Sequence, residues 1–120
     1  MPFEEAGTIV PGMRGGVVLR IGPDLYVLGG TEIKTLLFYG STVSVWKYSA
    51  QRTLEGYARI GMQFAGVART SRSGRAVLFR IGGITYIVPR DDLADVAKRR
   101  RDEAPLSRIV PRETRREEHG

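Results

Sequence analysis

The strongest constraint on the fold is a short motif that occurs twice in the chain, 60 residues apart. The segment VVLRIG at 17–22 returns as VLFRIG at 77–82, and YVL at 26–28 returns as YIV at 86–88. The match continues at helical spacing, because three apolar residues after each copy correspond: Ile33, Leu36 and Leu37 with Leu93, Val96 and Ala97. A repeat at a fixed spacing indicates one supersecondary unit used twice, here at about 17–40 and 77–100.

Each copy predicts a β-hairpin followed by a helix. In both copies, residues that favour strands flank a glycine-containing turn, at 22–24 and at 82–83. Thr31 is placed to cap a helix after the first hairpin, although the Thr, Phe and Tyr residues of 35–39 also fit a strand. The repeat favours the helix. After the second hairpin, Asp91 is expected to cap a helix that ends with the basic residues 98–101.

Four further segments have the composition of strands. They are a short one at 8–10, an alternating one at 42–48 followed by a loop at 49–53, and two at 55–60 and 62–69 separated by Gly61. The second half then has the order β-β-β-β-α, which resembles the element order of the single-strand-binding Whirly and Pur-type folds.

The expected fold class is therefore mainly β (α+β): a small antiparallel sheet or a partly open barrel, built from a duplicated hairpin-plus-helix unit. Residues 1–104 are predicted to form one small domain that contains the repeat. Residues 105–120 hold two prolines and many charges, and we expect a flexible tail there.

The composition argues against several classes of function. The chain has 120 residues, of which 42% are hydrophobic, so a packed core is expected. It has no cysteine, and its one histidine is His119, so we expect no metal, no cofactor and no enzymatic activity. A serine nucleophile with a lysine base remains an alternative. No apolar run approaches the roughly 18 residues of a spanning helix, and Met1–Glu5 does not resemble a signal peptide. A cytoplasmic protein without a membrane partner is the expectation.

The positive charge is concentrated in one part of the chain. The net charge is +6, and the stretch 59–80 contains five arginines and no acidic residue. Within it, Arg69, Arg72 and Arg75 lie in a predicted loop with three hydroxyl side chains, which could surround a phosphate. An ordinary solvated loop explains the same composition. The basic run 98–101 is a weaker candidate, because cations also neutralise the end of a helix.

Aromatic residues next to arginines suggest contact with bases. A three-residue turn would place Arg20 opposite Tyr26 and Arg80 opposite Tyr86, where each pair could stack on a base or simply on itself. A two-residue turn at Gly82-Gly83 would instead place Arg80 opposite Thr85. Trp46 is expected on the outward face of its strand, either for stacking or for packing against another element or subunit.

Two functions follow from these patterns. The first is a small basic protein that binds single- or double-stranded nucleic acid by neutralising phosphates and stacking on bases, with little sequence specificity. Its expected binding residues are Arg69, Arg72, Arg75, Arg80, Arg20, Trp46 and Tyr86. The alternative is a non-enzymatic structural or assembly protein, such as a homo-oligomeric accessory or viral component. Both hairpins are nearly continuous in apolar residues, as in sheets covered on both faces, and a homodimer or larger homo-oligomer would supply the second cover.

Overall fold

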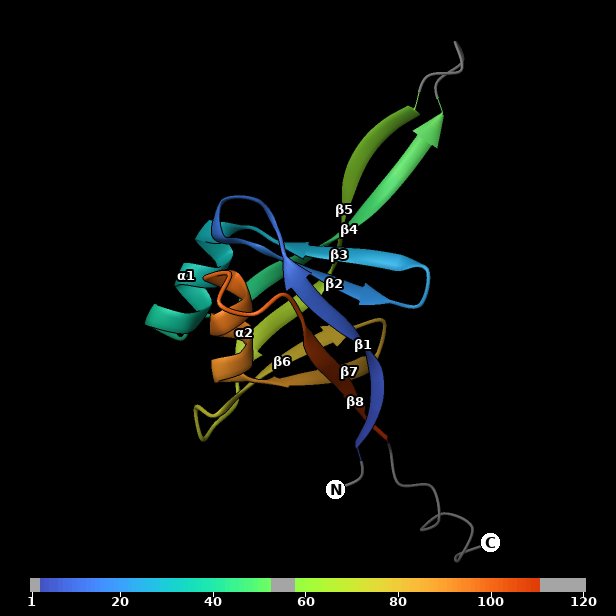
Figure 1. Cartoon of the computed structure of the whole chain (residues 1–120). Helices are drawn as coiled ribbons and strands as arrows, with labels where there is room; N and C mark the ends of the chain where they lie inside the picture. The colour runs from blue at the N-terminus through green and yellow to red at the C-terminus, as the bar shows by residue number, and fades with distance from the viewer. Residues whose placement is uncertain (1–2, 53–57, 111–120) are drawn as a thin grey trace, which may run out of the picture.

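In the computed structural model, which describes residues 3–52 and 58–110, eight antiparallel strands form a closed barrel (Figure 1). The strands follow one another in chain order, and the last pairs with the first. They are β1 (Phe3–Pro11), β2 (Val17–Ile21), β3 (Asp24–Leu28), β4 (Val43–Arg52), β5 (Ala58–Thr70), β6 (Ala76–Ile81), β7 (Ile84–Pro89) and β8 (Ala104–Ile109). The mainly-β prediction is confirmed, but the barrel is closed, whereas the sequence suggested a small sheet or a partly open barrel.

Two helices lie side by side at one end of the barrel (Figure 1). They are α1 (Gly30–Tyr39) and α2 (Arg90–Ala97), and a single 3₁₀ turn, η1 (Met13–Gly15), lies between β1 and β2. Each helix buries two apolar side chains three positions apart, which is the stripe that the repeat predicted: Ile33 and Leu36, and Leu93 and Val96. Burying a side chain of this size contributes roughly 1.5–3 kcal/mol, so these four residues hold both helices on the barrel. The alternative prediction of a strand at 35–39 is wrong, because these residues belong to α1.

Strand β8 closes the barrel, and it lies where the sequence suggested a tail. It pairs with β1 on one side and with β7 on the other, and Ala104 and Leu106 are fully buried. The predicted boundary at 104/105 is therefore wrong, because the ordered fold continues through Ile109. Two buried apolar residues among prolines and charges are a weak signal, which explains the error. Residues 111–120 of the expected tail lie outside the described residues.

The repeat is confirmed, and it is longer than the sequence alone showed. Each half has the order β-β-β-α-β, with β1, β2, β3, α1 and β4 in the first and β5, β6, β7, α2 and β8 in the second. The β-β-β-β-α order expected for the second half is wrong, because β5 runs without a break through Gly61. The correspondence between the first strands of the two halves was missed because their similarity lies in backbone geometry. A Cβ added at Gly7 would collide with the carbonyl oxygen of Arg20, and a Cβ at Gly66 would collide with that of Arg80.

The strands β4 and β5 form a long hairpin that extends beyond the barrel (Figure 1). Strand β4 continues to Arg52, so the loop expected from residue 49 onward is wrong as far as Arg52. Part of the strand expected at 55–60 lies outside the described residues. Among the described residues, β4 pairs with β3 only at Trp46 and Lys47, and β5 pairs with β6 only from Gly66 onward. The outer part of the hairpin is therefore a two-stranded ribbon.

The ends of the helices differ in detail from the prediction. Helix α1 begins at Gly30, and α2 begins directly after Pro89, so neither Thr31 nor Asp91 is a cap; both lie in the first turn. Helix α2 ends at Ala97, before the basic run, and Arg99 has a left-handed backbone with φ of 60°. The N–H groups of Arg100 and Arg101 both reach the carbonyl oxygen of Asp95, which closes the helix end.

Candidate functional site

The two repeat hairpins close with two-residue turns, and this decides where the repeated arginines and tyrosines lie. Arg20 is paired with Leu25, and Arg80 is paired with Thr85, to which its Nη1 donates a hydrogen bond of 3.2 Å. The second turn, Gly82-Gly83, has φ of 60° and 80°, a conformation that favours glycine. The expected Arg–Tyr oppositions are wrong for both hairpins, and the two-residue alternative holds for Arg80.

The repeated tyrosines point into the barrel. Tyr26 is 9% exposed and Tyr86 is 6% exposed, and Tyr86 is paired with Phe79 on one side and Arg108 on the other. Burial raises the pKa of the Tyr86 phenol, the nearby Tyr26 raises it further, and the Arg108 guanidinium lowers it. The Tyr86 ring is therefore covered, and its position does not suit stacking on a base.

Trp46 belongs to a group of large apolar side chains on one face of the β4–β5 hairpin. Trp46 is directly opposite Phe64, and their ring centroids are 6.0 Å apart in an edge-to-face arrangement. Tyr48 and Met62 form the next pair on this face, because each lies two residues from Trp46 or Phe64, farther from the barrel. Phe64 is 61% exposed and Met62 is 56% exposed. We call these four residues the hairpin face.

The opposite side of the same ribbon is polar. It carries Lys47, Ser49 and Gln63, and the Lys47 ammonium forms an exposed ion pair of 3.5 Å with Asp24. The described part of the hairpin therefore has one apolar face and one polar face. Sequence reasoning missed Phe64 and Met62 because it divided β5 at Gly61. The alternation within 62–64 places Met62 and Phe64 on one face of the strand, but their pairing with Tyr48 and Trp46 depends on the register of the hairpin.

The arginine loop is ordered by its own hydroxyl groups. The Ser71 hydroxyl accepts a hydrogen bond from the Ala76 N–H (3.1 Å), and the Ser73 hydroxyl accepts one from the Arg75 N–H (3.3 Å). The Thr70 hydroxyl donates to the carbonyl oxygen of Leu36 on α1 (3.3 Å). These hydroxyls help to order the turn and connect it to α1, and a phosphate held by the hydroxyls and guanidinium groups together stays a prediction. Its arginine side chains remain exposed.

Four of the predicted binding residues share one region of the barrel wall. Arg69 and Arg80 lie on the outward face of β5 and β6 at diagonal positions, for which roughly 7–8 Å between residues is typical. Arg72 and Arg75 are exposed in the adjoining loop. Among residues 3–52 and 58–110, none of the four takes part in an ion pair. We call this group, Arg69, Arg72, Arg75 and Arg80, the arginine face.

The remaining predicted binding residues lie elsewhere. Arg20 is on β2, which is separated from β5 by two strands, and Trp46 is engaged with Phe64. The structure thus groups the arginines of 69–80 and buries Tyr86, while Trp46 lies on the outward side of β4, the strand next to β5.

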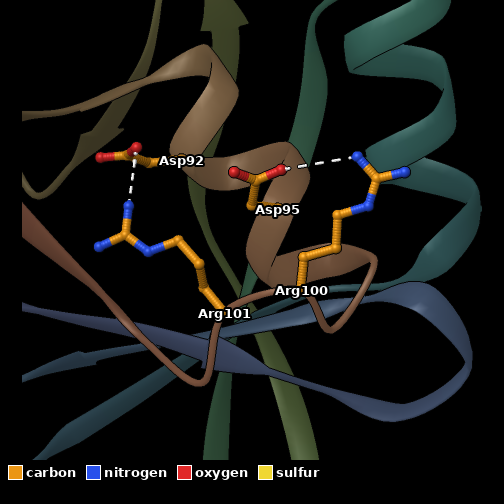
Figure 2. Close-up of polar contacts among 4 residues, drawn as sticks. All are labelled: Asp92, Asp95, Arg100 and Arg101. Carbon is orange, nitrogen blue, oxygen red and sulfur yellow. Dashed lines mark ion pairs between the residues drawn. The ribbon is translucent and has the colours of Figure 1, made fainter.

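Two of the four cations in the basic run after α2 are paired with carboxylates of the same helix. Figure 2 shows Asp92 paired with Arg101 at 2.8 Å and Asp95 paired with Arg100 at 4.0 Å. The Arg99 guanidinium donates to the carbonyl oxygen of Gly12 (2.8 Å). Three of the four cations therefore have partners in the chain, in agreement with a role in closing the helix end.

Within the ranges that the structure describes, no three His, Asp or Glu side chains group as a metal ion would require. No helix in those ranges is long and apolar enough to cross a membrane. No family model, curated protein or solved structure matches this chain.

Proposed function

We propose that this protein is a non-enzymatic assembly protein that forms a homodimer or larger homo-oligomer through the hairpin face. The observation that supports this proposal is the gathering of Trp46, Tyr48, Met62 and Phe64 on an element that extends beyond the barrel. Contiguous exposed apolar surface on a small protein usually marks an interaction site. Aromatic residues and methionine are also the residues enriched at the centres of interfaces.

The local architecture gives a second argument. An isolated two-stranded ribbon is marginally stable in water, because each strand has a partner on one side only and no layer covers its apolar face. The outer part of the β4–β5 hairpin is such a ribbon. Packing the hairpin face of one copy against that of another would bury both apolar faces around a two-fold axis, as in most homodimers.

Light scattering coupled to size-exclusion chromatography tests the proposal. The wild-type chain should have at least the mass of a dimer at micromolar concentrations, and the variant Met62→Ser/Phe64→Ser should have the mass of a monomer. The control is Met13→Ser/Tyr39→Ser, which removes two comparably exposed apolar side chains outside the hairpin. A monomeric wild type across the concentration series, or equal dissociation of the control, would contradict the proposal.

Binding to the phosphate backbone of nucleic acid is the second candidate, and the arginine face supports it. Four exposed arginines without ion-pair partners in the described part of the chain can each neutralise a phosphate. Such contacts position a protein on nucleic acid but carry no base information, so binding should be similar for different sequences. Stacking on Tyr86 is not part of this candidate, because that ring is buried, whereas stacking on Trp46 stays a prediction.

Fluorescence anisotropy with labelled single-stranded and duplex DNA at two salt concentrations tests this second function. Arg72→Ala/Arg75→Ala should weaken binding and flatten the slope of log affinity against log salt by roughly 0.7–0.9 per lost contact. The matched control Arg100→Ala/Arg101→Ala removes the same charge from residues that pair with Asp95 and Asp92. Equal effects of the two double variants would show that net charge alone determines the binding, and would remove the arginine face from this function.

A further inference from the structure

A concave surface lies between the two helices. It is a groove of ≈ 570 Å³ bordered by α1, α2 and the turn η1. Its floor is apolar: it consists of the core residue Ile33, of Leu37 and Ala97, which pack against the core, and of Ala94. Its rim carries four cations, contributed by all three elements: Arg14, Lys34, Arg90 and Lys98. We call it the helix groove.

The rim has one sign of charge. No Asp or Glu side chain is among the described residues that line the groove. Two of the three carboxylates of α2 are directed to other partners, because Asp92 and Asp95 pair with Arg101 and Arg100 (Figure 2). Gly30 and Thr31, in the first turn of α1, also border the groove, whereas Glu32 of the same turn is not among the lining residues. Clefts lined by one sign of charge concentrate the opposite sign.

The fold positions two of these residues, Arg90 through its guanidinium and Arg14 through its backbone. The Arg90 guanidinium donates a hydrogen bond of 2.6 Å to the carbonyl oxygen of Leu37, so it connects the two helices across the groove. Arg14 has a left-handed backbone, with φ of 53° and ψ of 45°, which is a strained conformation for a residue other than glycine. The surrounding packing maintains it, since a Cβ at Gly30 would collide with the Arg14 carbonyl oxygen.

The floor distinguishes this groove from a simple basic patch. Alanines at 94 and 97 leave space between the helices, and the exposed Phe38 extends the apolar surface at the edge of the groove. A nucleic-acid backbone would satisfy the cations but would leave this apolar floor exposed. A peptide with carboxylates on its flanks and apolar side chains in its centre would satisfy both features.

We propose that the helix groove binds an acidic amphipathic peptide segment of a partner protein. A second copy of this chain is a poor occupant of this positively charged groove, because the chain has a net charge of +6. The apolar side chains of the partner segment would pack on Leu37, Ala94 and Ala97, and its carboxylates would pair with the rim. The groove lies on the helical end of the barrel and includes no residue of the hairpin face, so this proposal is independent of the proposed function.

Fluorescence anisotropy with a labelled synthetic peptide tests the proposal on the full chain. The probe carries leucines at helical spacing with glutamates between them, and a second probe has serine in place of each leucine. The first probe should bind, and Lys34→Glu and Lys98→Glu should each weaken its binding about tenfold or more, because a like charge then faces the probe. Ala94→Trp, which fills the floor without changing charge, should also weaken it.

The matched control for charge reversal is Arg20→Glu. Arg20 is an equally exposed cation on β2 and does not line the groove, so this variant should bind the probe like the wild type. Thermal unfolding followed by circular dichroism confirms that each variant is folded. Three results would each overturn the proposal: equal weakening by Arg20→Glu, equal binding of the serine probe, or displacement of the peptide by single-stranded DNA with the same dependence on Lys34 and Lys98.

Discussion

Two arms of the molecule occupy equivalent places in the repeat and have different surfaces. One is the β4–β5 hairpin, and the other is the pair formed by β8 and β1, and the two arms extend from the barrel in different directions (Figure 1). Both arms have a β-bulge next to the glycine that approaches a carbonyl. The extra, unpaired residue is Ala65, directly before Gly66, in one arm and Ala6, directly before Gly7, in the other. Beyond this bulge, toward the end of each arm, each residue pair of one arm has an equivalent pair in the other.

The outward pair just beyond the bulge shows the difference most clearly. In the β8–β1 arm this pair is Ser107 and Glu5, whereas in the hairpin it is Trp46 and Phe64. The backbone register is the same, so the barrel accepts polar residues at this position. The aromatic pair is therefore not a requirement of the fold. This comparison supports a role for the hairpin face outside the chain.

The largest expected effect tests the geometry that both arms share. Gly66→Ala and Gly7→Ala should each destabilise the protein by about 3 kcal/mol, because the new methyl group would collide with a carbonyl oxygen. The control is Gly61→Ala in the same hairpin, where the nearest atom would be 3.9 Å away and the change should be at most about 0.5 kcal/mol. Urea unfolding measures all three. A mild effect at one glycine alone would show that the arms are not equivalent.

A smaller effect is expected when the hairpin is given the surface of the other arm. Trp46→Ser/Phe64→Glu should lower the free energy of unfolding of the monomer by roughly 0.5–1.5 kcal/mol, the contribution of an aromatic pair. Chemical unfolding in dilute solution, where oligomers dissociate, measures this change. Loss of the folded barrel in this variant would mean that the aromatic pair stabilises the fold, and the comparison between the arms would fail.

The pH dependence of stability should report the burial of Tyr86. Its folded-state pKa is raised, so the folded state retains the phenolic proton more strongly than the unfolded state. This contribution is complete below the unfolded pKa of about 10 and is lost as pH rises through the folded value. Stability should therefore fall more steeply above about pH 10 in the wild type than in Tyr86→Phe. If the melting temperatures of the two proteins fell equally steeply with pH above about 10, this prediction would be contradicted.

The smallest effect concerns the charged pair of the β8–β1 arm. Glu4 and Arg108 form an ion pair. The equivalent residues of the hairpin, Gln63 and Lys47, cannot form one, because Gln63 is uncharged. Because both members are about half exposed, Glu4→Gln should change stability by no more than about 0.5 kcal/mol. A change in thermal stability well beyond this limit would show that the charged pair, and not the shared backbone, stabilises that arm.

The sequence predicted the parts of the fold whose signal is carried by side-chain pattern. The hairpins and helices of the repeat follow from Arg-Ile-Gly, the tyrosines and the apolar helix positions. Strands β1 and β5 correspond through Gly7 and Gly66, whose role depends on a close approach that only the folded backbone reveals. Strand β8 was missed because its burial rests on Ala104 and Leu106 alone.

The candidate site was predicted in part. The grouping of Arg69, Arg72, Arg75 and Arg80 follows from an acid-free segment, but a one-residue difference in turn length moved Tyr86 from the surface to the interior. The helix groove could not be inferred, because Arg14, Lys34 and Arg90 are far apart in the chain and meet only when the helices pack side by side.

Disulfide cross-linking tests the role of the hairpin face most directly, because the chain contains no cysteine of its own. Met62→Cys introduces one thiol on the hairpin face, and Gln63→Cys introduces one on the opposite face of the same strand. Under mild oxidation, the account predicts that Met62→Cys forms covalent dimers rapidly at low protein concentration, whereas Gln63→Cys remains largely uncross-linked. Equal cross-linking of the two variants, or none in either, would contradict the claim that these hairpins meet through their apolar face.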